Sequence, residues 1–160
     1  MCARFAPDFK VVEIYKKSYE RRLVAGKYEE IYDALVFAVK HIFHDLGLKK
    51  GQVHVSGGVD SSVVLPIVVE ALGKDNVIAI SNPSHYNGTV TKNNAFDLCN
   101  ALNVALYWNN MEPVQQALKA SHIDAFGEGS VTNMVLSTFD AVGRTVQGLA
   151  AAHTFGSGII

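Results

Sequence analysis

The most informative stretch of this chain is HVSGGVDSS, His54-Val55-Ser56-Gly57-Gly58-Val59-Asp60-Ser61-Ser62. Residues 52–56, which lead into it, alternate as in a β-strand, and residues 61–73 read as a buried helix that stops at a glycine. A strand that turns into a helix through small residues gathers unpaired backbone N–H groups at one point, and the helix dipole adds positive potential there. The pattern therefore predicts an anion-binding loop.

The glycines and serines of this stretch are suited to a phosphate ligand. Gly57 and Gly58 let the backbone approach an anion closely and adopt positive φ angles. Ser56, Ser61 and Ser62 add hydroxyl donors. The alternative interpretation is a tight strand-to-helix turn that uses glycines and binds no ligand.

Asp60 is the acidic residue of the stretch, and a carboxylate beside phosphates repels them unless a cation lies between. Mg²⁺ is the natural mediator, because it prefers one or two carboxylates together with phosphate oxygens and water. The stretch is not a Walker A sequence, and no G-x-G-x-x-G motif follows a strand. We therefore expect a different phosphate loop, with Asp60 as a magnesium ligand.

Strands and helices alternate along the rest of the chain. Residues 1–26 look like a leader or linker, and the domain is expected over 27–160. Further strands are predicted at 76–81, 104–109 and 157–160, and further helices at 28–47, 89–103, 113–121 and 132–154. The first of these helices carries apolar residues at spacings of three and four, at Ile31, Leu35, Ala38, Ile42 and Leu46. This alternation predicts a three-layer α/β fold with a parallel sheet and flanking helices.

Pro66 does not fit the helix predicted for residues 61–73. A proline inside a helix removes one backbone hydrogen bond and kinks the helix, so either a kink or a later helix start is expected.

The composition of the 160 residues, 49% hydrophobic and 18% charged, fits one globular domain. A formal net charge of −1 with scattered basic residues provides no footprint for nucleic acid or an anionic membrane. No apolar run approaches the roughly 20 residues of a membrane span and no signal-peptide core occurs, so a cytoplasmic protein is expected. Cys2 and Cys99 match no zinc or CxxC spacing, which fits unbridged thiols.

Three segments together resemble a known family. SGGVDSS looks like the S-G-G-x-D-S pyrophosphate loop of the N-type ATP pyrophosphatases, which activate a carboxylate or carbonyl with AMP. Within that superfamily the chain resembles the synthetase domain of NAD synthetase from about residue 28 onward. Residues 82–104, NPSHYNGTVTKNNAFDLCNALNV, resemble its P-S-x-Y-S-S segment and the following helix. Residues 138–160, TFDAVGRTVQGLAAAHTFGSGII, resemble its E-N-x-Q-A-R-x-R helix and the next strand.

The resemblance implies an adenine nucleotide alpha hydrolase-like fold and an AMP-forming reaction. ATP adenylates the nicotinate carboxylate of deamido-NAD, pyrophosphate leaves, and ammonia, supplied free or from glutamine, then displaces AMP. Arg144 matches the first arginine of A-R-x-R and would contact deamido-NAD; Asp60 would hold Mg²⁺. No protein nucleophile is required, and a homodimer is expected. The residues implied around the ATP phosphates are Ser56, Gly57, Gly58, Asp60, Ser61 and Ser62.

The chain also departs from the family pattern. His54 stands where the family has a glycine, and Val146 where it has a second arginine. The family continues beyond the point matched by Ile160 through a T-G-x-x-x-E segment, so a partial domain is expected. Three alternatives stay open: a nucleotide-binding remnant or interaction module without catalysis, another ATP pyrophosphatase, and a generic phosphate-binding domain.

A few further residues are candidates for the site. Asn82 and Pro83 follow the second strand, and ligands of open α/β sheets bind at the carboxyl ends of strands, so both are candidates for adenine contact. Tyr86 and Trp108 either border the adenine or belong to the core or its rim. His41 and His44 share a helix face, but without a third ligand they read as surface histidines.

Overall fold

The computed structural model describes residues 26–83 and 89–160. Nearly the whole segment predicted as a leader therefore lies outside the described residues. The elements, in chain order, are α1 (Lys27–Asp45), β1 (Lys50–His54), α2 (Val59–Leu72), η1 (Lys74–Asn76), β2 (Val77–Ser81), α3 (Thr89–Leu102), β3 (Ala105–Trp108), α4 (Glu112–Phe126), η2 (Glu128–Ser130), α5 (Asn133–Phe155) and β4 (Ser157–Ile159). The predicted alternation of strands and helices is confirmed.

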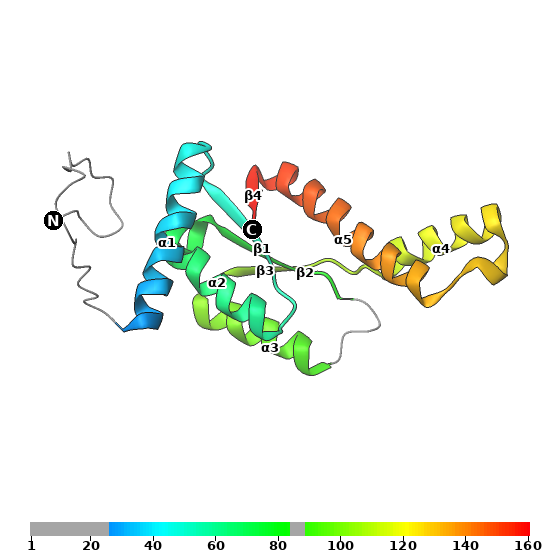
Figure 1. Cartoon of the computed structure of the whole chain (residues 1–160), viewed down its shortest axis with the longest axis horizontal. Helices are drawn as coiled ribbons and strands as arrows, with labels where there is room; N and C mark the ends of the chain where they lie inside the picture. The colour runs from blue at the N-terminus through cyan, green and yellow to red at the C-terminus, as the bar shows by residue number, and fades with distance from the viewer. Residues whose placement is uncertain (1–25, 84–88) are drawn as a thin grey trace, which may run out of the picture.

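The four strands form one parallel sheet in the order β3-β2-β1-β4. Alternate residues of β1 face opposite layers, as the pleat of a strand requires. Val53 and Val55 pack with buried residues of α2 and α3, including Leu65 and Cys99. The opposite face of the sheet is covered by α5, which lies across the strands from α2 and α3 (Figure 1). The predicted three-layer α/β architecture is therefore confirmed.

Helix α1 packs beside α2, but the face that it buries differs from the apolar face predicted from the spacing of its residues. The Phe43 ring lies over the sheet where β1 and β4 carry Gly51 and Gly158, and a Cβ on either glycine would lie within 3.2 Å of that ring. Tyr32 donates a hydrogen bond of 2.8 Å to the Glu70 carboxylate on α2. Apolar residues occur on more than one face of α1, and the face that packs on the sheet is the one that carries Phe43. The apolar residues at spacings of three and four lie elsewhere on the helix and are exposed: Ile31, Leu35, Ala38, Ile42 and Leu46.

Helix α2 begins at Val59, two residues before the predicted start, and Pro66 lies inside it. The sequence allowed for a helix that starts after Pro66, and this alternative is wrong. Because proline has no N–H, the Ser62 carbonyl receives no hydrogen bond from position 66.

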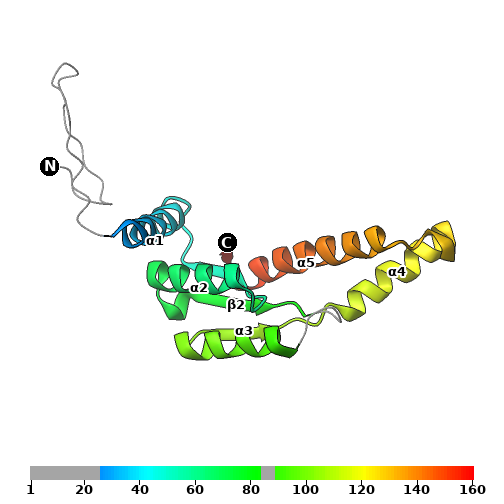
Figure 2. The ribbon, with the colours of Figure 1, turned by 60° about the horizontal axis from the view of Figure 1, so that its bottom comes forward.

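Helices α4 and α5 form an arm that projects away from the sheet (Figure 2). Helix α4 runs to Phe126, five residues beyond its predicted end, and stops where Gly127 adopts a φ of +82°. The Gln115 amide donates a hydrogen bond to Asp140, which ties α4 to α5. Among the described residues no helix combines the length and apolar character needed to cross a bilayer.

Candidate nucleotide-binding site

The loop between β1 and α2 has the backbone geometry that its glycines predict. Gly57 adopts a φ of +79°, which residues with a Cβ rarely take. A Cβ at this position would lie 1.8 Å from the Thr91 carbonyl oxygen on α3. The Asn94 amide, also on α3, lies 3.4 Å from the Gly57 carbonyl as a weak donor. The loop is therefore packed directly against the first turns of α3, and only glycine fits at position 57.

The serines of the loop form hydrogen bonds with the loop itself. The Ser62 and Ser61 hydroxyls donate to the Gly58 carbonyl at 2.8 and 3.2 Å. The Gly58 N–H donates to the Ser56 hydroxyl at 3.2 Å, and the Ser56 N–H donates to the Ser61 hydroxyl at 3.3 Å. These bonds hold the turn in shape, and a bound anion would compete with the two that use N–H groups.

Asp60 is exposed in the first turn of α2, beside this loop. No group of three or more His, Cys, Asp or Glu side chains able to hold a metal ion occurs within residues 26–83 and 89–160.

The His41 and His44 pair shows no metal-site geometry. The His41 ring packs on Phe37 with 4.1 Å between ring centroids, and His44 Nδ1 lies 3.2 Å from the Asp45 carboxylate. Both contacts are those of surface histidines, as the sequence reading favoured.

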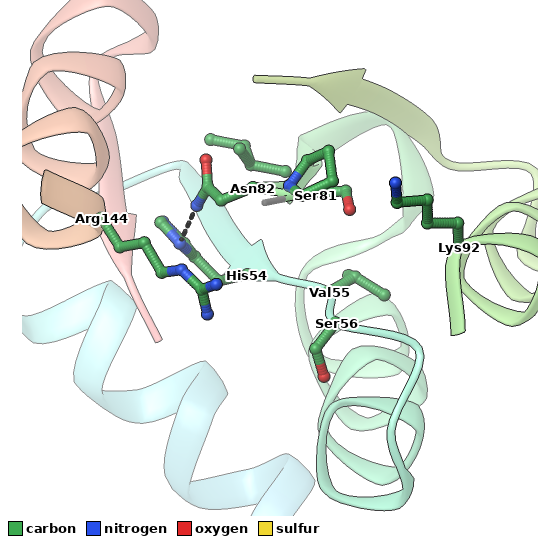
Figure 3. A pocket seen from close by; sticks show the side chains of 9 residues that line it. His54, Val55, Ser56, Ser81, Asn82, Lys92 and Arg144 are labelled. Atoms are coloured by element: carbon green, nitrogen blue, oxygen red, sulfur yellow. Dashed lines mark hydrogen bonds between the residues drawn. The ribbon is translucent and has the colours of Figure 1, made fainter. Parts of the chain in front are cut away.

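A pocket opens beside the loop, at the carboxyl ends of β1 and β2 (Figure 3). It brings together the predicted candidates Ser56, Asn82, Pro83 and Arg144, which come from three separate parts of the chain. Trp108 does not line it, and Tyr86 lies outside the described residues. The full lining consists of His54, Val55, Ser56, Ile80, Ser81, Asn82, Pro83, Lys92 and Arg144.

Beneath the pocket lies a polar network centred on His54. Its Nε2 lies 3.2 Å from the Gln52 amide nitrogen, and its Nδ1 lies 2.8 Å from the Asn82 amide nitrogen. Gln52 is fully buried and donates to the Gly148 carbonyl on α5 at 2.8 Å. The Asn82 carbonyl oxygen accepts from the Asn109 amide at 2.9 Å. The chain of hydrogen bonds thus links α5, β1 and the ends of β2 and β3.

The environment of His54 favours the neutral imidazole. Burial is the main cause that lowers the pKa of His54, and the positive charge of Arg144 lowers it further. A protonated ring donates from both nitrogens, whereas the groups near these nitrogens are amide nitrogens, which are also donors. The neutral ring accepts from one of these amides, whereas the charged ring could accept from neither, so hydrogen bonding also favours the neutral form. The ring N–H then faces the other amide nitrogen, so only one of the two contacts is a hydrogen bond.

Arg144 reaches the pocket from α5. Its guanidinium forms an ion pair with Asp140 at 2.9 Å, one helical turn away. Its Nε is buried and has no hydrogen-bond partner among the described residues. Buried donors are nearly always paired in folded proteins, so an unpaired Nε at a pocket is a natural contact for a ligand acceptor.

Several members of the site were missed in the sequence, among them Ser81 in the pocket lining and Asn109 in the polar network, and above all Gln52 and Lys92. Gln52 precedes His54 by two residues in an alternating strand, so the sequence indicates that the two side chains share a face of the sheet. Glutamine is rarely buried in a strand, so the pattern alone did not mark Gln52 as a site residue. Lys92 lines the pocket from α3, and nothing in the spacing of residues 89–103 marks it.

Comparison with known proteins identifies similar chains. A family model described as NAD synthase matches residues 31–157. The glutamine-dependent NAD(+) synthetase of Xylella fastidiosa is 33% identical over 163 residues, which cover 96% of this chain and 29% of that protein. The NH(3)-dependent NAD(+) synthetase of Thermotoga neapolitana is 33% identical over 88 residues, covering 55% of this chain and 30% of the relative. The chain thus spans less than a third of the length of these relatives.

Solved structures share the fold. The glutamine-dependent NAD+ synthetase of Acinetobacter baumannii, solved in complex with ADP, superposes with a TM-score of 0.81 at 22% identity, over 88% of this chain and 26% of that chain. The NMN synthetase of Francisella tularensis superposes with a TM-score of 0.74 at 20% identity, over 84% of this chain and 54% of that chain. These similarities confirm the adenine nucleotide alpha hydrolase-like sheet.

Proposed function

This chain belongs to the NAD synthase family, and we propose that it is the ATP-binding part of an enzyme that amidates deamido-NAD to NAD. The reaction consumes ATP and forms AMP and pyrophosphate. Its nitrogen comes from ammonia, either free or released from glutamine; relatives of both kinds match the chain.

The observation that carries this proposal is the loop of residues 56–58 at the start of α2. Gly57 takes a positive φ and is packed against α3, so the loop amides are fixed before a ligand arrives. N–H donors at a helix N-terminus stabilise phosphate charge. The Ser56 and Gly58 N–H groups would exchange their bonds to the Ser61 and Ser56 hydroxyls for bonds to the phosphate. We assign the ATP phosphates to Ser56, Gly57, Gly58, Asp60, Ser61 and Ser62.

Asp60 would hold Mg²⁺ beside this loop, and the ion would supply positive charge there. Asp60 is exposed and supplies one carboxylate, and the remaining ligands would be phosphate oxygens and water. When bound, the ion neutralises charge that builds up on the leaving pyrophosphate. The residues of the chain itself align ATP, and no side-chain nucleophile takes part.

We propose that Arg144 contacts the deamido-NAD substrate. Its Nε has no partner among the described residues, and a guanidinium fork pairs well with phosphate or carboxylate oxygens. Bound there, the substrate would lie across the pocket from α3, with its carboxylate directed toward ATP. Adenylation then joins the carboxylate oxygen to the α-phosphorus as the bond to pyrophosphate breaks, and ammonia later replaces AMP at the carbonyl carbon.

We propose that two copies of this chain form a homodimer through α5. The side of α5 away from the sheet exposes Val142, Val146 and Leu149 at helical spacings of four and three, with exposed fractions of 52%, 59% and 51%. A second copy of this helix would cover such a stripe. We also propose a cytoplasmic protein, since the reaction draws on ATP.

A nucleotide-binding module without catalysis is the second candidate. The observation in its favour is that the Arg144 guanidinium already pairs with Asp140, and Val146 leaves no second arginine on this helix. Such a module would bind ATP and release no pyrophosphate.

Titration calorimetry of the purified chain with ATP, with and without Mg²⁺, tests the proposal. Magnesium-dependent binding should weaken about tenfold or more in Asp60→Ala, since hydrogen bonds and ligand contacts of charged groups contribute about 1.5–3 kcal/mol. Asp124→Ala, at an exposed position on α4, is the matched control and should bind as wild type does. Absence of binding by the wild-type chain would refute the ATP site.

Incubation with ATP, Mg²⁺, deamido-NAD and an ammonium salt then separates the two candidates. Formation of NAD together with AMP supports the synthetase. ATP binding without AMP formation shows that this chain by itself acts as a nucleotide-binding module.

A further inference from the structure

Lys92 lies on the wall of the pocket opposite Arg144. It belongs to the first turns of α3, while Arg144 comes from α5 on the other face of the sheet (Figure 3). Its side chain is partly buried, and it has no hydrogen bond or ion pair within residues 26–83 and 89–160. The apolar stem of a lysine packs along the protein surface while its ammonium stays accessible, so this charge is available to an anionic ligand.

The pocket has an excess of positive charge, and Lys92 is its source. Of the residues that line it, Arg144 and Lys92 carry full positive charges, and none is acidic. The Arg144 guanidinium is compensated by Asp140 at 2.9 Å. His54 is held neutral by burial and by its neighbours. Among the described residues that line this pocket, Lys92 is therefore the charged side chain that no acidic group pairs with.

Lys92 is also close to the phosphate loop, because its neighbours on α3 contact that loop directly. The Thr91 carbonyl lies where a Cβ of Gly57 would stand, and the Asn94 amide approaches the Gly57 carbonyl. The lysine side chain is a point charge on a flexible four-carbon stem, so it can follow a phosphate oxygen at the mouth of the loop.

We propose that Lys92 is a phosphate-binding residue of this chain that contacts the nucleotide from the α3 side of the pocket. The inference rests on the proposed function, since the phosphate belongs to a nucleoside triphosphate held by residues 56–62. Lys92 and the loop amides then bind the phosphate chain from two sides. Arg144, on the far wall, stays available to the second substrate.

Calorimetry with Mg·ATP and with Mg·pyrophosphate tests the role of Lys92. Replacing Lys92 with alanine should weaken both ligands by about tenfold, the lower end for a charge-assisted hydrogen bond at a partly exposed site. Lys92→Arg should retain most of the affinity. Lys119→Ala, an exposed lysine on α4, is the control and should bind both ligands as wild type does.

Salt dependence adds a readout that a purely structural role would not move. The loss caused by Lys92→Ala should shrink as sodium chloride is raised, because exposed charges are screened. An unchanged affinity in Lys92→Ala, or a loss that is equal at low and high salt, would overturn the assignment to Lys92 while leaving the ATP site in place. No binding of ATP by the wild-type chain would instead overturn the proposed function and this inference with it.

Discussion

Replacing Gly57 with alanine should destabilise the chain far more than the same change at the neighbouring Gly58. At position 57 the new Cβ would lie 1.8 Å from the Thr91 carbonyl oxygen and 2.7 Å from its carbon, and both are backbone atoms. The φ of +79° adds strain for any residue with a Cβ. At position 58 the φ is −85°, and the nearest atom to a new Cβ is the Ser56 hydroxyl at 3.3 Å.

The size of the effect follows from two separate costs. A left-handed φ costs alanine about 1–2 kcal/mol, and forcing an added methyl group into packed backbone costs about 1–3 kcal/mol more. Gly57→Ala should therefore lower the free energy of unfolding by about 2–5 kcal/mol. Gly58→Ala exchanges one helix N-cap residue for a poorer one and should cost about 0.5–1 kcal/mol.

Urea unfolding followed by far-UV circular dichroism measures both variants against wild type. A shift of the midpoint without a change of slope reports the stability difference. Equal losses for Gly57→Ala and Gly58→Ala would refute the close packing of the loop on α3, on which the preorganised phosphate site depends.

Three further outcomes follow from the buried polar groups. Gln52→Leu should lower the free energy of unfolding by about 1–3 kcal/mol in urea titrations, because its buried partners lose their hydrogen bonds; a neutral or stabilising effect would contradict the network. The pKa of His54 is lowered from its usual value of 6.5 by burial and by Arg144, so below that pH the unfolded state binds more protons. The free energy of unfolding should therefore fall as pH drops from about 7 through the pKa of His54 in the unfolded chain toward its lower pKa in the folded chain. Urea titrations of His54→Gln should lack this part of the pH dependence. An equal pH dependence in wild type and His54→Gln would contradict the lowered pKa of His54. Burial raises the pKa of the Cys99 thiol. In a Cys2→Ser chain, a thiol reagent should therefore label Cys99 only after unfolding, and rapid labelling of this variant in its native state would refute the burial of Cys99.

The sheet and its phosphate loop were predictable because local chemistry determines them. The alternation of residues 52–56 and the glycines that follow report a strand and a turn without reference to the rest of the chain. Every predicted strand and helix of the described residues occurs, with shifts at the ends. The meeting of Ser56 and Arg144 at one pocket was expected only through family resemblance, since 88 positions of chain separate them and no local rule joins them.

The remaining features depend on tertiary packing that a pattern does not contain. Spacing marked Ile31 and Leu35 as the apolar face of α1, yet Phe43 packs over the glycines of the sheet and fixes the rotation of the helix. Lys92 reaches the pocket because α3 packs against Gly57, which follows from the three-dimensional contact. The burial of Gln52 also depends on tertiary packing, because α5 crosses close to β1 at Gly148 and covers the glutamine.

Amide NMR spectra of the ¹⁵N-labelled chain, recorded as Mg·ATP is added, test whether the loop of residues 56–62 binds the phosphates. We expect the largest shifts on the backbone amides of these residues, with Gly57 and Gly58 foremost, since their N–H groups would face the phosphates. Shifts confined to other parts of the chain, or no shifts at saturating ATP, would contradict a phosphate-binding role for this loop.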